Sequence, residues 1–140
     1  MTVIATRNEL ELIRDFTNVL ITGVGAFNVM SALRNIARDT PILNVGYAGS
    51  NTLQIGTRHR VGRVGIYHPN VEFADFEYEI GDGVPCYTST DFVLHSDRKE
   101  PCLYDMELGF ILAMGFTNVV AEKVVSDNLS INEYSEVLNG

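Results

Sequence analysis

Tryptophan is absent from this chain, and long apolar runs are missing as well. The longest such run, residues 108–116, covers about nine positions, whereas a membrane-spanning helix needs roughly 20. Near the start of the chain, the charged residues Arg7 and Glu9 come before an apolar segment as long as a secretory signal can form. We therefore expect no signal peptide, no membrane partner and a cytoplasmic location.

Basic residues are scarce. Ten lysines and arginines stand against 18 aspartates and glutamates, which leaves a formal net charge of -8. Nucleic-acid binding depends largely on lysine and arginine, which displace counterions from the phosphates. An acidic chain repels that backbone, so we exclude nucleic acid as a partner.

Cysteine occurs only twice, at Cys86 and Cys102, with 15 residues between them and no Cys-x-x-Cys motif. In a chain without a signal peptide such a pair predicts two buried thiols, in preference to a disulfide or a zinc site. The histidines, His59, His68 and His95, lack the spacing of metal ligands. We predict that the protein uses no metal ion and no other cofactor.

What the chain does contain is the composition of a folded protein, with 46% hydrophobic and 20% charged residues. A chain of this length can bury one compact core, so we predict a single domain over residues 1–140. Apolar periodicity and breaker residues predict the following elements. Strands are expected at 1–5, 17–22, 42–45, 61–67 and 119–125, helices at 7–15, 27–39, 107–115 and from 131, a small-residue loop at 46–50, and a loop or hairpin at 70–85.

The alternation of these strands and helices favours an α/β fold. Residues 42–45 (ILNV) are almost continuously apolar, which is typical of a strand buried on both faces in a largely parallel sheet. We predict a three-layer α/β sandwich around a mixed, mostly parallel central sheet.

Two glycine-containing turns are ambiguous on their own. Gly23 and Gly25 follow a predicted strand and open a helix, but Asn28 stands where a dinucleotide-binding fingerprint has its third glycine, so a plain tight turn is predicted. In the loop 46–50 the glycines either relieve backbone crowding or turn backbone amides towards an anion or a sugar hydroxyl. The sequence leaves both explanations open for this loop.

The acidic residues most suited to chemistry stand at the ends of rigid elements. Glu107 opens a predicted helix, and Asp127 directly follows the predicted strand 119–125 and Ser126. Side chains at such ends leave the packed scaffold but are held by it. Structural explanations remain open too, because Glu9 and Glu107 suit a helix dipole and Asp127 suits an N-cap or an Asx-turn.

Six segments then follow one another along the chain: ATRNEL, NVGYAG, IGTRHRVGRV, STDFV, DMELGFILA and VVSDN. This succession resembles the purine nucleoside phosphorylase superfamily, and most closely its 5′-methylthioadenosine/S-adenosylhomocysteine nucleosidase branch. The likeness runs in order over nearly the whole chain, although the chain is shorter than typical members. Its most specific elements are the Met-Glu pair at 106–107 and the Ser-Asp pair at 126–127.

The resemblance implies a nucleoside phosphorylase-like fold and a role for each matching residue. Asp127 would be the general acid that protonates purine N7, with Ser126 supporting it. Glu107 would bind the ribose hydroxyls, and Met106 would pack on the sugar.

The rest of the implied site binds the base and the attacking water. Phe92 would stack on the base and the backbone of Val93 would read its edge, while Ala48 and Gly49 are assigned to substrate binding. Glu9 stands where nucleosidases carry the carboxylate that orients water, a region where phosphorylases tend to have a phosphate-binding arginine. This difference favours hydrolysis.

The predicted function is hydrolysis of the N-glycosidic bond of a purine nucleoside of the 5′-methylthioadenosine/S-adenosylhomocysteine type. The alternatives are a phosphate-dependent nucleoside phosphorylase and a catalytically silent nucleoside-binding module. The resemblance also implies a homodimer or higher homo-oligomer, because the relatives form much of the 5′ pocket from a neighbouring subunit. The helix after Met106 and a helix face with Phe27, Met30 and Leu33 are the candidate interfaces.

Overall fold

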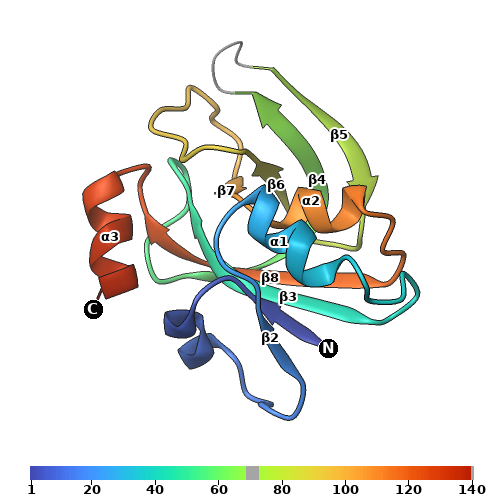
Figure 1. Ribbon diagram of the computed structural model, residues 1–140. Helices are drawn as coiled ribbons and strands as arrows, with labels where there is room; N and C mark the ends of the chain where they lie inside the picture. Colours follow the sequence, from blue (N-terminus) through green and yellow to red (C-terminus); the bar gives the residue numbers. More distant parts are fainter. Residues whose placement is uncertain (69–72, 140) are drawn as a thin grey trace.

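The computed structural model describes residues 1–68 and 73–139. Most elements lie where periodicity predicts them. In chain order (Figure 1) they are β1 (Thr2–Ile4), the 3-10 helix η1 (Arg7–Leu12), β2 (Val19–Ile21), α1 (Ala26–Leu33), β3 (Ile42–Gly49), β4 (Arg58–His68), β5 (Phe73–Glu79), β6 (Val84–Thr88), β7 (Leu103–Asp105), α2 (Leu108–Ala113), β8 (Val119–Asp127) and α3 (Ile131–Asn139).

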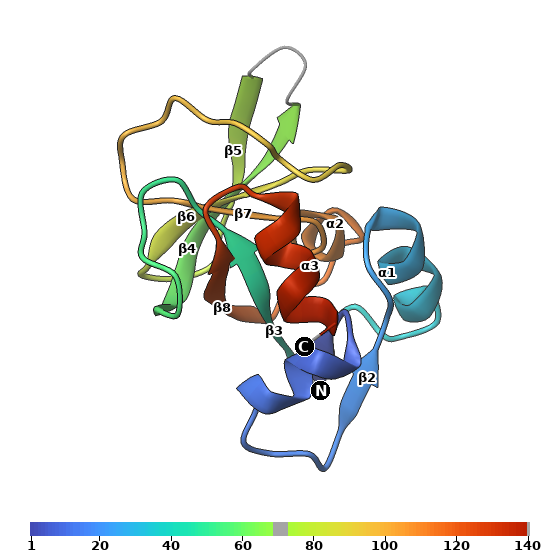
Figure 2. The same ribbon diagram turned by 90° about the vertical axis from the view of Figure 1, so that its left-hand side faces the viewer.

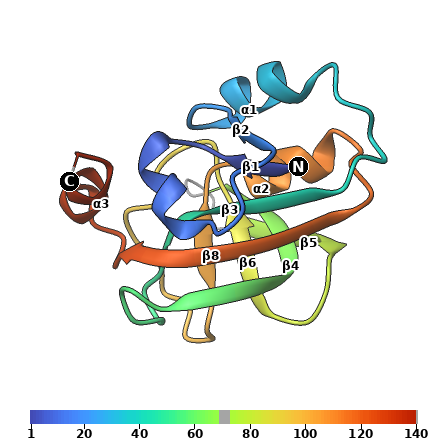
Figure 3. The same ribbon diagram turned by 90° about the horizontal axis from the view of Figure 1, so that it is seen from below.

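The strands form one sheet that closes on itself. The strand order is β2-β1-β3-β7-β6-β4-β5, and β8 pairs with both β3 and β4. Strands β3, β7, β6, β4 and β8 therefore form a ring, and Figure 3 shows β8 lying between β3 and β4. Because β8 runs parallel to β3 and antiparallel to β4, the sheet is mixed.

An α/β fold with a mixed sheet is thus confirmed, but the strands do not build the predicted three-layer sandwich. A sandwich needs an open sheet with a helix layer on each face. Here β8 pairs along both of its edges, which curls the sheet into a barrel. The long strand β4 makes the closure possible, because its first residues pair with β8 and its later residues pair with β6 and β5.

Helices cover the barrel on different sides. Val29 and Leu33 of α1 and Leu108 and Ile111 of α2 are fully buried in the main apolar core. Figure 2 shows α1 and α2 together, with η1 and α3 on other parts of the surface. η1 covers a smaller apolar cluster around Val45 of β3. The main core therefore fixes β3 and the start of α2 relative to each other.

Residues 46–50, predicted as a loop, are mostly strand, because β3 continues to Gly49 and stays paired with β8. Glycine usually weakens strands, but it also marks close approaches of other atoms to the backbone. A Cβ at Gly46 would lie 2.6 Å from a Glu9 carboxylate oxygen, and one at Gly49 would lie 2.8 Å from an Asp127 oxygen. The glycines therefore let two carboxylates pack against a strand.

The predicted helices are shorter in the structure. Residues 7–15 form only the 3-10 helix η1, and the helix expected at 27–39 ends as α1 at Leu33. None of the helices described is long and apolar enough to cross a membrane.

Two smaller predictions are confirmed. Of the segment 70–85, predicted as a loop or a hairpin, residues 73–79 form β5 and pair antiparallel with β4, so they are one arm of a hairpin whose other arm precedes the segment. Residues 69–72 lie outside the described residues. Cys86 and Cys102 are both buried free thiols. Burial raises the pKa of the Cys86 thiol well above its usual value, which favours the protonated form over the reactive thiolate.

Candidate active site

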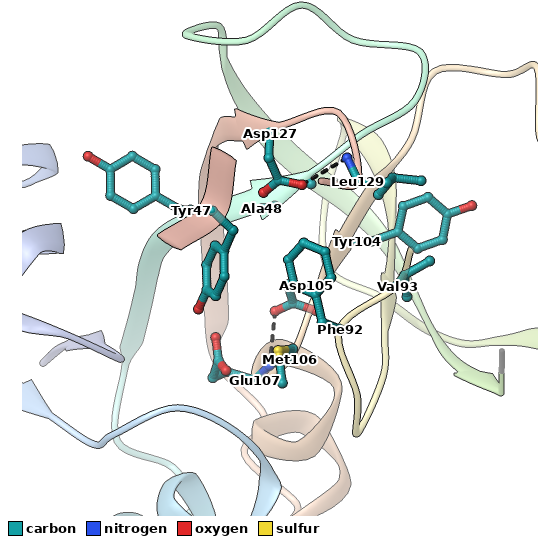
Figure 4. A pocket seen from close by; sticks show the side chains of 12 residues that line it. Tyr47, Ala48, Phe92, Val93, Tyr104, Asp105, Met106, Glu107, Asp127 and Leu129 are labelled. Carbon is teal, nitrogen blue, oxygen red and sulfur yellow. Dashed lines mark hydrogen bonds between the residues drawn. The ribbon is translucent and has the colours of Figure 1, made fainter. Parts of the chain in front are cut away.

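A pocket lies where β3, β7 and β8 end, beside the start of α2 (Figure 4). Its walls combine carboxylates with aromatic and aliphatic side chains: Tyr47, Ala48, Gly49, Phe92, Val93, Tyr104, Asp105, Met106, Glu107, Asp127, Leu129 and Tyr134. The carboxyl ends of the parallel strands β3 and β8 meet here, and such ends are common places for ligands in α/β proteins. The carboxylates of Glu107 and Asp127 thus face one cavity.

Asp127 is the last residue of β8 and has an exposed fraction of 0%. One carboxylate oxygen accepts a hydrogen bond from the Leu129 backbone N–H at 2.9 Å (Figure 4), and the other accepts one from the Ser126 hydroxyl at 2.7 Å. The first bond is the Asx-turn that the sequence left open. Burial raises the pKa of Asp127, although the bonds from Ser126 and Leu129 oppose that shift.

Glu107 directly precedes α2, but its side chain does not cap that helix. One of its oxygens accepts a hydrogen bond at 3.0 Å from the backbone N–H of Gly25, in the turn before α1. Asp105 caps α2 instead, because its carboxylate accepts bonds from the backbone N–H groups of Leu108 at 2.7 Å and Glu107 at 3.3 Å. A favourable helix dipole is therefore not a sufficient explanation for Glu107, because the turn before α1 holds its side chain.

A buried lysine supports these carboxylates. Lys123 in β8 has a side-chain exposed fraction of 1%, and its Nζ lies 3.1 Å from Oδ2 of the fully buried Asp105. A Cβ at Gly46 would lie 3.5 Å from Lys123 Nζ and 2.6 Å from a Glu9 oxygen, so both groups crowd the same point of β3. The charges of Asp105, Glu107 and Glu9 all act on this one ammonium group.

The charge states in this cluster depend on one another. Burial raises the pKa of Glu107 to about 7, with Lys123 opposing the shift and Asp105 adding to it. Burial also acts to raise the pKa of Asp105, but Lys123 and the hydrogen bonds from Thr88 and Leu108 hold that pKa below its usual value. We therefore expect Asp105 and Lys123 to form an ion pair at neutral pH, whereas Glu107 binds a proton more readily than an ordinary glutamate.

Glu9 is buried beside the pocket but does not line it. Its carboxylate accepts hydrogen bonds from the backbone N–H groups of Ala5 at 2.7 Å, Thr6 at 3.1 Å and Tyr47 at 2.7 Å. These bonds tie η1 to β1 and β3, so Glu9 has the structural role at a helix start that the sequence left open. It stands at the back of β3, close to Lys123.

Aromatic and aliphatic side chains complete the walls. The ring of Phe92 packs against that of Tyr134, with 5.2 Å between the ring centroids. Val93 and Met106 line the same cavity. Tyr47 also contributes to the wall, but its hydroxyl donates a hydrogen bond to Glu11 at the surface.

The structure brings most of the predicted site residues together. Seven line the pocket: Ala48, Gly49, Phe92, Val93, Met106, Glu107 and Asp127. Ser126 stands behind the Asp127 carboxylate, and Glu9 lies behind β3. Within the part of the chain that is described, no three histidine, cysteine, aspartate or glutamate side chains are grouped so that they could hold a metal ion.

Sequence reasoning missed Asp105, Lys123 and Tyr134. A signal existed for Lys123, because in β8 it alternates in phase with the buried residues Ala121 and Val125, which predicts an inward side chain. Asp105 stands three residues before Leu108, a spacing at which aspartate caps a helix. No sequence signal distinguishes Tyr134, because only the placement of α3 brings it to the pocket.

Known proteins resemble this chain in structure. No protein-family model matches the chain, and no curated protein matches it. Solved structures do match over nearly its whole length. The 5′-methylthioadenosine/S-adenosylhomocysteine nucleosidase (MTAN) of Chlamydia trachomatis aligns with a TM-score of 0.72 at 15% identity, covering 99% of this chain and 86% of that chain. The chain has the nucleoside phosphorylase and hydrolase fold.

Two further solved structures align with this chain over nearly its whole length. The MTAN of Neisseria meningitidis in complex with methylthio-immucillin-A has a TM-score of 0.69 at 15% identity, with 98% of this chain and 90% of that chain covered. The futalosine hydrolase of Helicobacter pylori has a TM-score of 0.70 at 16% identity, with 98% and 89% covered. At these identities the likeness concerns the fold, and it confirms the fold family expected from the sequence.

Proposed function

We propose that this protein hydrolyses the N-glycosidic bond of a purine nucleoside of the 5′-methylthioadenosine/S-adenosylhomocysteine type and releases the free base. The observation that carries the proposal is a single pocket in which two buried carboxylates, Asp127 and Glu107, face an aromatic side chain, Phe92. The fold neighbours include nucleosidases, which supports the general reaction class.

Asp127 is the proposed general acid. Cleavage of an N-glycosidic bond leaves the purine with excess negative charge, which a proton at N7 neutralises. An aspartate can give up that proton only if its pKa is raised, and burial raises the pKa of Asp127. A well-placed general acid accelerates such a reaction by about 10²- to 10⁴-fold.

Glu107 is the proposed ribose ligand. Its carboxylate is fixed by one backbone bond from Gly25 and keeps acceptor capacity for the hydroxyls of a sugar. Negative charge near the sugar also stabilises the oxocarbenium-like transition state. Met106 lines the pocket next to Glu107 and is suited to pack on the sugar.

Glu9 is the proposed water-positioning group. Three backbone N–H groups fix its carboxylate, and an ionised carboxylate has about four lone-pair sites, so one acceptor site is left for water. A water molecule reaches the Glu9 carboxylate by a path beside β3, past Tyr47 and the backbone at Gly46. Among the described residues that line the pocket none is an arginine, which favours water over phosphate as the nucleophile.

The two alternative functions, a nucleoside phosphorylase and a silent binding module, can be distinguished from a hydrolase by experiment. A nucleoside phosphorylase releases base only when phosphate is present, and a silent binding module binds nucleosides without turnover. Base release from 5′-methylthioadenosine should therefore be followed with and without inorganic phosphate. Release that does not depend on phosphate supports hydrolysis, release that requires phosphate supports the phosphorylase, and tight binding without release supports the binding module.

A 2′-deoxynucleoside is expected to be cleaved at least about tenfold less efficiently than the matching ribonucleoside. Without the 2′-hydroxyl, the buried Glu107 carboxylate loses a partner, and an unsatisfied buried polar group costs about 1–3 kcal/mol. The measurement is kcat/KM for both substrates in wild type and Glu107→Gln, with the exposed Glu79→Gln as control. Equal use of both sugars by the wild type would contradict the role of Glu107.

We also propose that the protein forms a homodimer through α1. Phe27 and Met30 are 80% and 44% exposed, and they follow the turn whose Gly25 N–H binds Glu107. Leu33, predicted with them, is fully buried, and α2 is packed into the core. The exposed part of α1 is therefore the candidate interface that remains, and it lies close to the pocket.

The double variant Phe27→Glu, Met30→Glu is expected to sediment as a monomer of 15.5 kDa, whereas the wild type sediments as a dimer. A stable interface buries at least about 1,200 Å² in total, and two new charges at its centre would be desolvated. Phe16→Glu, at another exposed apolar position, is the matched control. A monomeric wild type with full nucleosidase activity would show that the pocket needs no second subunit.

A further inference from the structure

The proposed base-binding residues, Phe92 and Val93, stand on a long irregular segment. Residues 89–102 join β6 to β7, and none of them belongs to a helix or a strand. Irregular loops longer than about 12–15 residues are uncommon in compact domains, and they are usually functional or disordered. Because no helix or sheet bonds hold this segment, side-chain contacts must fix Phe92 and Val93 beside the pocket.

One of these contacts is made by Arg98, whose guanidinium group lies on the ring of Tyr87 in β6. Its Cζ is 4.1 Å from the centroid of that ring, and its Nη1 donates a hydrogen bond of 3.0 Å to the Tyr87 hydroxyl. The ring of Tyr67 in β4 is also close, with 5.8 Å between its centroid and Arg98 Cζ. Arginine suits this position, because its planar group stacks on aromatic rings and also carries several N–H donors.

The contact with Tyr87 is stronger than the other contact of Arg98. Nη1 also lies 3.6 Å from a carboxylate oxygen of Glu100, whose side chain is 52% exposed, whereas that of Arg98 is 28% exposed. Long ion pairs at the surface contribute little, and a cation–π contact gains strength as the cation is shielded from water. The stacking on Tyr87 is therefore the contact that anchors the segment.

The ring of Tyr87 connects this anchor to the pocket wall. It stacks on the ring of Tyr104 in β7, with 5.5 Å between the centroids and 28° between the planes. Tyr104 lines the pocket, and Val93 is buried in the same apolar cluster as the two tyrosines. Arg98 and Val93 thus hold the irregular segment on one cluster of rings.

Ser96 and Asn51 fix the backbone around Arg98. The Ser96 hydroxyl is hydrogen-bonded to the Tyr104 hydroxyl, and it accepts a bond of 3.2 Å from the Arg98 N–H. The Asn51 side chain donates bonds to the carbonyls of Ser96 at 3.0 Å and Arg98 at 2.8 Å. The backbone at Arg98 is therefore held in place, which directs its side chain over Tyr87.

We propose that Arg98 is a positioning residue for the base, because by anchoring residues 89–102 to Tyr87 it holds Phe92 and Val93 where they contact the purine. The contact with the purine rests on the proposed function, whereas the anchoring of the segment does not. Contacts to the base act on the bound substrate and on the transition state alike. Their loss therefore raises KM and leaves kcat nearly unchanged.

The first test is steady-state kinetics with 5′-methylthioadenosine. Arg98→Met keeps an unbranched apolar side chain over Tyr87 but loses the charge and the N–H donors, and it is expected to raise KM about tenfold while kcat changes less than about twofold. Arg98→Lys keeps the charge without the planar group, and Tyr87→Phe keeps the ring without the hydroxyl. Both are expected to raise KM by a smaller factor, and the exposed neighbour Lys99→Met is the control.

Urea unfolding of the same variants shows whether they are folded. If Arg98→Met does not fold, the milder Arg98→Lys and Tyr87→Phe decide the question by their KM. Folded Arg98 variants with the KM of the wild type overturn the proposal. A lower kcat at unchanged KM also overturns it, because Arg98 would then act on the reacting groups or on the amount of active protein.

The second test needs no nucleoside and separates the anchor from the proposed function. Backbone order parameters from ¹⁵N relaxation are expected to be about 0.85 at Phe92 and Val93 in the wild type and below about 0.6 in Arg98→Met. Those of β6 and β7 are expected to stay unchanged, as are all values in Lys99→Met. Unchanged order at residues 89–102 in Arg98→Met overturns the anchor. A wild type without nucleosidase activity refutes the proposed function, and the order parameters then still decide whether Arg98 holds the segment.

Discussion

Replacing Asp127 with asparagine is expected to lower turnover of 5′-methylthioadenosine by about two orders of magnitude or more while leaving the fold intact. Asparagine has no proton to give to the purine, but its side-chain oxygen can still accept the Leu129 N–H bond that forms the Asx-turn. Loss of rate without loss of stability therefore separates the acid role from the turn role. The measurement is kcat together with urea unfolding, with the exposed Asp97→Asn as the matched control.

The pH dependence gives a second criterion for Asp127. The protonated form is the active form, so activity must fall as the pH rises through the pKa of Asp127, which burial raises. In Asp127→Asn this decline is expected to disappear from the residual activity. An asparagine variant that is as active as the wild type would leave Asp127 with only a structural role.

Replacing Lys123 with methionine is expected to have the largest effect on stability. Methionine has a similar length but no charge, so the fully buried Asp105 would lose its ion-pair partner. Removing one partner of a buried ion pair typically costs about 3–5 kcal/mol in the free energy of unfolding. We expect nucleosidase activity to fall as well, because Asp105 holds the start of α2, where Glu107 stands.

The sign of the pH effect distinguishes charge from packing. In the wild type the pKa of Asp105 is lowered on folding, so its stabilising contribution is present above the unfolded pKa and is lost as the pH falls through the folded pKa. Without Lys123 burial dominates and raises the folded pKa, so the variant loses stability as the pH rises above the unfolded value. The difference between variant and wild type is therefore expected to be larger at pH 8 than at pH 5.

Urea unfolding at the two pH values measures this difference. Lys123→Arg keeps the charge and is expected to be less harmful, and the exposed Lys99→Met is the control. Adding Asp105→Asn to Lys123→Met removes both buried charges and is expected to recover part of the lost stability. A loss of stability that is the same at both pH values and is not relieved by the second substitution would point to packing alone.

Local sequence patterns were sufficient to predict several parts of this protein. The apolar periodicity placed most strands and helices, and it placed Glu107 and Asp127 at the ends of two of them. The alternation in β8 also contained the information that Lys123 points inward. These features can be read from a sequence because the direction of a side chain in a strand or helix follows from its position in that element.

Only the tertiary structure decided how these elements meet. The barrel closes because β8 pairs with β3 on one edge and with β4 on the other, and no local pattern specifies a partner so distant in the chain. Because of this pairing, Gly46 and Gly49 belong to a strand and Lys123 lies beside Asp105. It also leaves Glu9 behind β3. Whether a carboxylate faces a cavity, a backbone amide or a buried ammonium group depends on contacts between distant segments of the chain. Tertiary packing therefore determined the charge of the site, and it also brought Tyr134 into the pocket.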